Sequence, residues 1–163
     1  MNIAPQRLLI GIAGLLLFVH GRLSASEQDR YAALFRRGPA IAETLKKAAP
    51  APRIVEADDG IVNFAIGLPT MSGFLFAIDP AGYTAFKKGT FLTEAHRRGY
   101  QLIGSLYYLR SATPDELTPA RIPDTLREKL FEADRWDLDR FDFALAYRDP
   151  ESGAVFIRFT PKP

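Results

Sequence analysis

The end of the chain carries the pattern that most restricts its fold. Apolar side chains recur at every second position in two runs, made up of Phe143, Leu145 and Tyr147 and then of Val155, Ile157 and Phe159. The turn-forming sequence Pro-Glu-Ser-Gly lies between the two runs. Because successive side chains of a strand point to opposite faces, this alternation predicts a half-buried β-hairpin.

Apolar runs further upstream predict four more strands, over residues 53–57, 61–66, 74–78 and 100–109. Asp59-Gly60, between the first two runs, is typical of a tight hairpin turn, because such turns need positive φ angles. Residues 67–73 predict a loop, since Pro69 cannot donate a hydrogen bond to a central sheet ladder. The run 100–109 is apolar at both parities, which predicts a central strand covered on both faces.

Capping residues and apolar periodicity predict helices over residues 26–37, 40–48, 79–89, 90–99 and 124–134. Gly38-Pro39 is expected to interrupt the first helical region. Asp79 and Thr90 are the expected N-caps of the two middle helices, and Pro80 suits a first helical position. The expected fold is α+β: one mixed, mostly antiparallel sheet of about five or six strands with helices packed on it, preceded by an N-terminal apolar helix.

The N-terminus predicts export or membrane attachment. Arg7 precedes an unbroken apolar run over residues 8–19, and the small residues Ser24 and Ser26 follow it. Twelve helical residues reach about 18 Å, which suits a signal peptide better than a full membrane span. A short tilted anchor and a buried N-terminal helix are the alternatives. Three regions are expected: a signal peptide or anchor (1–26), a helical stalk and linker (27–52) and an α+β globular domain (53–163).

Charge argues against nucleic acid as a partner. The chain has 21 Lys and Arg against 19 Asp and Glu. Without residues 1–26, which hold two arginines and no acid, the counts are equal. A neutral domain lacks the positive field that dominates affinity for a phosphate backbone.

Several kinds of catalytic or metal site lack their residues. The chain has no cysteine and two histidines, of which only His96 lies beyond the N-terminal segment. Thiol chemistry and the usual zinc ligand sets are therefore excluded, and no metal or cofactor is predicted. Ser72 does not lie in the strand–turn–helix context of a serine nucleophile. The acids between Asp134 and Asp142 alternate with arginines, which is typical of a solvated, ion-paired segment.

Four polar residues are the candidate ligand-binding residues: Asp58, Asn63, Thr70 and Ser72. Turn chemistry accounts for Asp59-Gly60 but leaves Asp58 unexplained. Asn63 interrupts an apolar run, and Thr70 and Ser72 flank the tip of a loop. No catalytic residue is assigned. Aromatic residues that could stack on a sugar or lipid head group are Tyr83, Tyr107, Tyr108 and Trp136.

Three stretches carry a resemblance to a known class: Asp-Asp-Gly-Ile at 58–61, Ser-Gly at 72–73 and Arg-Gly-Tyr at 98–100. With the apolar N-terminus, they resemble the soluble extracytoplasmic C-terminal domain of bacterial multi-pass, glycosyltransferase-like membrane proteins, over about residues 8–160. The catalytic carboxylates of those transferases lie between membrane helices and have no counterpart here. The resemblance therefore implies a place in the cell envelope and an accessory role.

These observations favour an exported or membrane-anchored (periplasmic) envelope domain that binds a ligand or partner without catalysis of its own. The expected partners are the membrane, through the N-terminal helix, and a saccharide, a lipid-linked ligand or an envelope protein. The alternative is a hydrolase acting on a saccharide or phosphoester through Asp58 and Asp59. A structural interaction domain is a third class, and it would show an exposed apolar patch.

Overall fold

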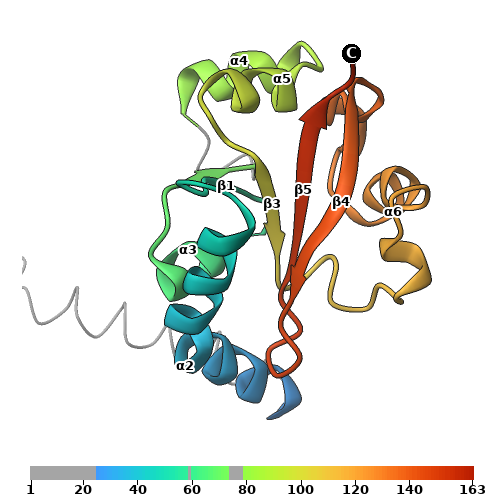
Figure 1. Ribbon diagram of the computed structural model, residues 1–163. Helices are drawn as coiled ribbons and strands as arrows, with labels where there is room; N and C mark the ends of the chain where they lie inside the picture. The colour runs from blue at the N-terminus through green and yellow to red at the C-terminus, as the bar shows by residue number, and fades with distance from the viewer. Residues whose placement is uncertain (1–24, 59, 74–78) are drawn as a thin grey trace, which may run out of the picture.

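A five-stranded sheet with helices on both faces forms the centre of the molecule (Figure 1). The computed structural model describes residues 25–58, 60–73 and 79–163. The strands are β1 (Ile54–Glu56), β2 (Thr70–Ser72), β3 (Leu102–Ser105), β4 (Phe141–Arg148) and β5 (Val155–Pro161). The helices are α2 (Ala25–Ala48), α3 (Ile61–Ile66), α4 (Pro80–Lys87), α5 (Phe91–Arg97) and α6 (Ile122–Lys129). Short 3₁₀ helices are η1 (Asp115–Leu117), η2 (Ala133–Trp136) and η3 (Leu138–Arg140). The predicted α+β class with one mixed sheet is confirmed.

The sheet is half parallel and half antiparallel, in the order β2-β1-β3-β5-β4. β1 pairs in parallel with β2 and with β3, whereas β5 is antiparallel to β3 and to β4. Two of the four strand pairings are thus parallel, whereas a mostly antiparallel sheet was expected. The reason is that helices connect the first three strands, and such crossovers return the chain in the same direction.

Each face of the sheet has its own apolar core. On the α2 face, Ile54, Leu102 and Phe156 pack with residues of α2 and α3. On the α4 face, the alternate residues Val55 and Ile103 pack with residues of α4, α5 and α6. The crossover from β1 to β2 runs through α3, and the return across β1 to β3 runs through α4 and α5. Parallel crossovers are right-handed, so two crossovers that move in opposite directions along the sheet place their helices on opposite faces. These two crossovers do so.

The segment 61–66, which was predicted to be a strand, forms α3. The carboxylate of Glu56 accepts hydrogen bonds from the backbone N–H groups of Val62 (2.7 Å) and Asn63 (3.2 Å), and so supplies the N-terminal cap. Gly60 (φ 103°) precedes the helix and Gly67 (φ 68°) follows it, and both have left-handed backbone conformations that glycine adopts readily. No hairpin therefore joins 53–57 to 61–66, and Asp59 itself lies outside the described residues.

Three other predicted elements differ from the structure or lie outside the described residues. Residues 70–72, predicted to be loop, form the edge strand β2. The predicted strand over 74–78 lies outside the described residues. The predicted strand over 100–109 is shorter than expected, but its core, β3, is central and buried at every position.

The C-terminal hairpin and the middle helices are confirmed. β4 and β5 pair over their whole length, with a register shift between Leu145 and Tyr147. Asp79 caps α4 by accepting from the N–H groups of Ala81 and Gly82. Thr90 stands at the N-cap of α5 without a side-chain cap. Asp137 takes that role, since its carboxylate accepts from the N–H groups of Leu92 (2.8 Å) and Thr93 (3.3 Å).

The helix α2 is continuous through Gly38-Pro39, where an interruption was expected. Leu34, Ile41 and Leu45 are fully buried against the α2 face of the sheet. Through these three residues, α2 packs against the sheet. Within the described ranges, no helix is long and apolar enough to cross a membrane. The apolar run 8–19 lies outside those ranges.

A partly buried ion pair between Arg37 and Asp149 fastens α2 to the turn between β4 and β5. Asp149 is fully buried, and it accepts hydrogen bonds from Ser152, Tyr147 and Arg37. Burial raises the pKa of Asp149, but the bonds from Ser152, Tyr147 and Arg37 outweigh it, and the net pKa lies below the usual value.

Arg37→Ala is expected to destabilise the protein, because it removes a charged partner from the buried Asp149 carboxylate. Arg36→Ala is the matched control, since the neighbouring Arg36 forms an exposed pair with Glu151 at 3.4 Å. Urea unfolding of both variants should give a clearly larger fall in midpoint for Arg37→Ala. Equal midpoints would contradict a stabilising role for the partly buried pair.

Candidate functional site

The carboxyl ends of β1, β2 and β3 lie at the same end of the sheet. The chain passes from β1 to β2 on one side of it and then returns to β3 on the other side, so the strand order reverses at β1. In open sheets with parallel strands, such a reversal leaves a crevice where ligands commonly bind. Three polar residues lie at these strand ends: Asp58, Ser72 and Ser105.

Asp58 bridges this crevice from β1 to the turn that follows β3. Its carboxylate accepts hydrogen bonds from the Ser105 hydroxyl (2.8 Å) and the backbone N–H of Tyr107 (2.9 Å). The N–H groups of Leu106 and Tyr108 donate to it as well. The residue is only 2% exposed. Burial raises the pKa of Asp58, and these hydrogen bonds offset part of the rise.

The turn that Asp58 holds presents an aromatic and a cationic side chain to solvent. Tyr107 is 53% exposed, and the Arg110 guanidinium lies over its ring, 5.0 Å from the ring centroid. Arg30 and Tyr31 of α2 border the same place, and the four residues surround a small depression above Leu106. We call Arg30, Tyr31, Tyr107 and Arg110 the tyrosine–arginine surface.

The shape of this surface suits contact with a ligand or partner and does not suit enclosure of one. Its depression holds only about 10 Å³, whereas pockets that enclose small molecules have about 300–1,000 Å³. Tyrosine rings provide flat apolar area with a polar edge. A guanidinium stacked on a ring keeps donors at its rim for polar partners.

The four predicted site residues have different surroundings. Asp58 is buried in the crevice, as described above. Asn63 is exposed on α3. Thr70 begins β2, and its carbonyl accepts from the Tyr100 hydroxyl at 3.4 Å. Ser72 ends β2 and is half-buried opposite Glu56. Thr70 and Ser72 thus lie at opposite ends of one strand, and Asp58 is bonded to the turn after β3.

The aromatic candidates also differ in exposure. Tyr107 is exposed beside Arg110, whereas Trp136 is 1% exposed and packs edge-on against Phe91. Trp136 therefore belongs to the core and cannot stack on a ligand. Neither Arg110 nor Glu56 was among the predicted site residues. An acid inside the apolar run 53–57 was the available signal for Glu56.

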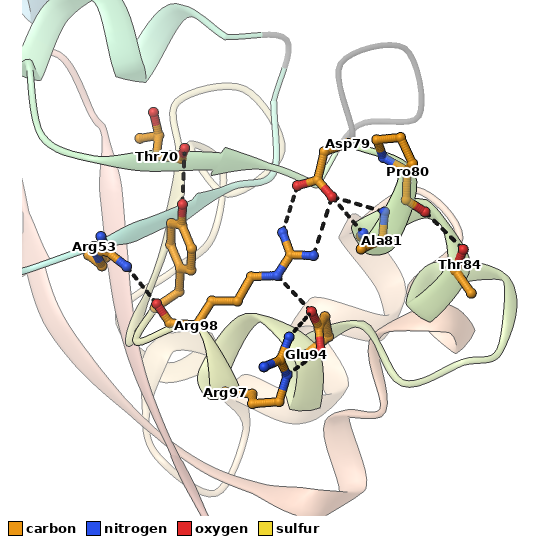
Figure 2. Close-up of polar contacts among 11 residues, drawn as sticks. Arg53, Thr70, Asp79, Pro80, Ala81, Thr84, Glu94, Arg97 and Arg98 are labelled. Carbon is orange, nitrogen blue, oxygen red and sulfur yellow. Dashed lines mark hydrogen bonds and ion pairs between the residues drawn. The ribbon is translucent and has the colours of Figure 1, made fainter.

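A polar network joins the ends of α4 and α5, and Figure 2 shows it. Arg98 binds Asp79 at 2.6 Å and Glu94 at 2.7 Å, and Arg97 makes two further bonds to Glu94 at 2.8 Å. Arg53 reaches the same corner by donating to the Arg98 carbonyl at 2.6 Å. Every charged group in this network has an internal partner, which indicates a structural role.

The network predicts a specific response to acid. Arg97 and Arg98 lower the pKa of Glu94 from 4.5 to about 2. Because the folded-state pKa is depressed, Glu94 stabilises the fold above about pH 4.5. That contribution is lost as the pH falls toward 2. Between pH 5 and pH 3, wild-type protein should lose about 1 kcal/mol more unfolding free energy than Glu94→Gln, a small value because the pairs are partly exposed. Urea titrations at both pH values test this, and parallel losses would contradict it.

Larger hollows lie elsewhere on the described part of the chain. One of about 600 Å³ lies between α6, η2 and η3, and acidic side chains and Arg127 line it. Among the residues that the structure describes, no group of three or more His, Cys, Asp or Glu side chains is placed to hold a metal ion.

The fold and the site therefore define an α+β domain with an exposed tyrosine–arginine surface. No family model matches the chain, and no curated protein or solved structure matches it either.

Proposed function

We propose that this chain is an exported or membrane-anchored domain of the cell envelope, which binds a ligand or partner without catalysis of its own. The observation that carries the proposal is the structural role of Asp58. Its buried carboxylate holds the turn that presents Tyr107 and Arg110. A rigid turn with an exposed aromatic residue is typical of a binding surface, because little entropy is lost when it binds.

The N-terminal sequence supports the location. Its order of charge, apolar run and small residues is that of an export signal or short anchor. The resemblance to the extracytoplasmic domain of glycosyltransferase-like membrane proteins agrees with a role beside a membrane. A saccharide, a lipid-linked saccharide or an envelope protein is the expected partner.

The surroundings of Asp58 weigh against the hydrolase alternative. A catalytic carboxylate must reach the substrate, whereas Asp58 is 2% exposed and accepts from four donors. To act as a base or metal ligand, it would have to give up the hydrogen bonds that hold the turn.

A photo-crosslinker placed at position 107 tests the binding role. Benzoylphenylalanine in place of Tyr107 should give adducts with a glycan, lipid or protein of the envelope in living cells. The same substitution at Tyr83 on α4 is the matched control, since the two tyrosines are 53% and 44% exposed. Adducts of equal yield at both positions, or none at 107, would count against the tyrosine–arginine surface.

Fractionation of the tagged full-length protein, with N-terminal sequencing of the product, tests the location. A start near Glu27 would indicate an exported domain with a cleaved signal, and an intact Met1 in membranes would indicate an anchor. Recovery of an intact chain in the cytoplasmic fraction would overturn the proposed location.

A further inference from the structure

The helical layer formed by α2 and α3 exposes two phenylalanines. Phe64 is 80% exposed and Phe35 is 49% exposed. On α3, Val62 and Ile66 are buried toward the sheet. At 100° per residue, Phe64 falls on the opposite side of the helix, so its ring points away from the sheet.

Phe35 lies on the flank of α2 that faces α3. Leu34 points toward the sheet, and Arg37 lies on the flank next to the β4–β5 turn. On the opposite flank of α2, Gly38 lies against the backbone of Ala65 on α3. At 100° per residue, Phe35 falls on this second flank. Both exposed rings therefore belong to one side of the molecule, away from the β4–β5 turn.

Most of the cations of α2 have acidic partners: Arg36 and Arg37 pair with Glu151 and Asp149 at the β4–β5 turn, and Lys46 pairs with Glu43. Residues 25–48 include five Lys and Arg residues against three acids. The two lysines lie in the last turn of α2. The layer is therefore not strongly basic, and its exposed aromatic residues are the feature typical of attachment to a membrane interface.

The chain upstream fixes how far this layer can lie from a bilayer. The apolar run ends at Val19, and α2 begins at Ala25. Val19 and Ala25 are six residue steps apart, so they can lie at most about 22 Å from each other. If the apolar run enters a membrane, α2 must therefore begin close to the membrane surface.

We propose that the α2–α3 layer docks on the phospholipid surface beside the N-terminal segment, with Phe35 and Phe64 entering the head-group region. This inference rests on the proposed membrane attachment and adds an orientation to it. The tether favours a lipid surface as the occupant, because it holds the layer near the bilayer whether or not a protein partner is present.

Fluorescent labels can test this docking in the intact chain. The sequence has no cysteine, so each introduced cysteine is unique. Phe35→Cys, Phe64→Cys and the control Tyr83→Cys would each carry an environment-sensitive NBD dye. Tyr83 is 44% exposed on α4, which packs on the opposite face of the sheet. The full-length proteins would be reconstituted in vesicles of phosphatidylglycerol and phosphatidylcholine.

The expected result is a severalfold brighter, blue-shifted emission at positions 35 and 64 than at 83, with protection from iodide quenching at 35 and 64 alone. Vesicle flotation separates the two ways of failing. Protein that floats but shows equal quenching at all three positions would overturn the docking and leave the anchor in place. Protein that does not float would overturn both.

Discussion

Gly38→Ala is expected to destabilise the protein by about 2–3 kcal/mol, although the same change inside a helix normally stabilises it by about 1 kcal/mol. A Cβ atom at position 38 would stand 1.8 Å from the carbonyl oxygen of Ala65. The obstacle is backbone, which cannot rotate away as a side chain can. The helices α2 and α3 would have to separate, and their shared core would loosen.

Pro39→Ala is the matched control for this prediction. Pro39 is the next residue of α2, and it is exposed. Replacing it restores a backbone donor inside the helix, so the free energy of unfolding should stay equal or rise. Urea unfolding of both variants gives the comparison. A stabilised Gly38→Ala variant would show that α2 and α3 do not meet at Gly38.

Asp58→Asn is expected to cost about 2–3 kcal/mol of unfolding free energy, because an amide offers one acceptor oxygen where the carboxylate offers two. Some of the buried donors of the 105–109 turn would lose their acceptor. Asp134→Asn is the control, since the Asp134 side chain is 73% exposed, and it should change stability by less than about 0.5 kcal/mol.

The sign of the Asp58→Asn effect also separates the two proposed roles. Replacement of a catalytic group often leaves stability unchanged or raises it, because active sites hold strained or unsatisfied groups. A stabilised Asp58→Asn protein would therefore favour the hydrolase alternative. A destabilised protein that also loses its crosslinks from position 107 would link Asp58 to the presentation of Tyr107.

Local signals in the sequence predicted the elements that depend on local chemistry. The alternation over 143–159 predicted the β4–β5 hairpin, and Asp79-Pro80 predicted the start of α4. Both features act within a few residues of chain, so composition and spacing reveal them.

The errors arose where distant residues decide the structure. The apolar run 61–66 fits a strand or a buried helix equally well, and the Glu56 carboxylate on β1 supplies its helix cap. Asp58 stood out as unexplained in the sequence. Its partners lie 47 to 50 residues further along the chain, and no spacing rule connects them. The parallel half of the sheet was missed for the same reason.

The sheet consists of two parts that are connected in different ways, and the two parts meet at β3. In the sheet that the structure describes, the pairing of β3 with β5 is the seam between strands joined by helices and strands joined by a short turn. The hairpin half can form from nearby residues, whereas the other half requires two long loop closures. The hairpin half is therefore expected to form before the half that carries Asp58 when the protein folds.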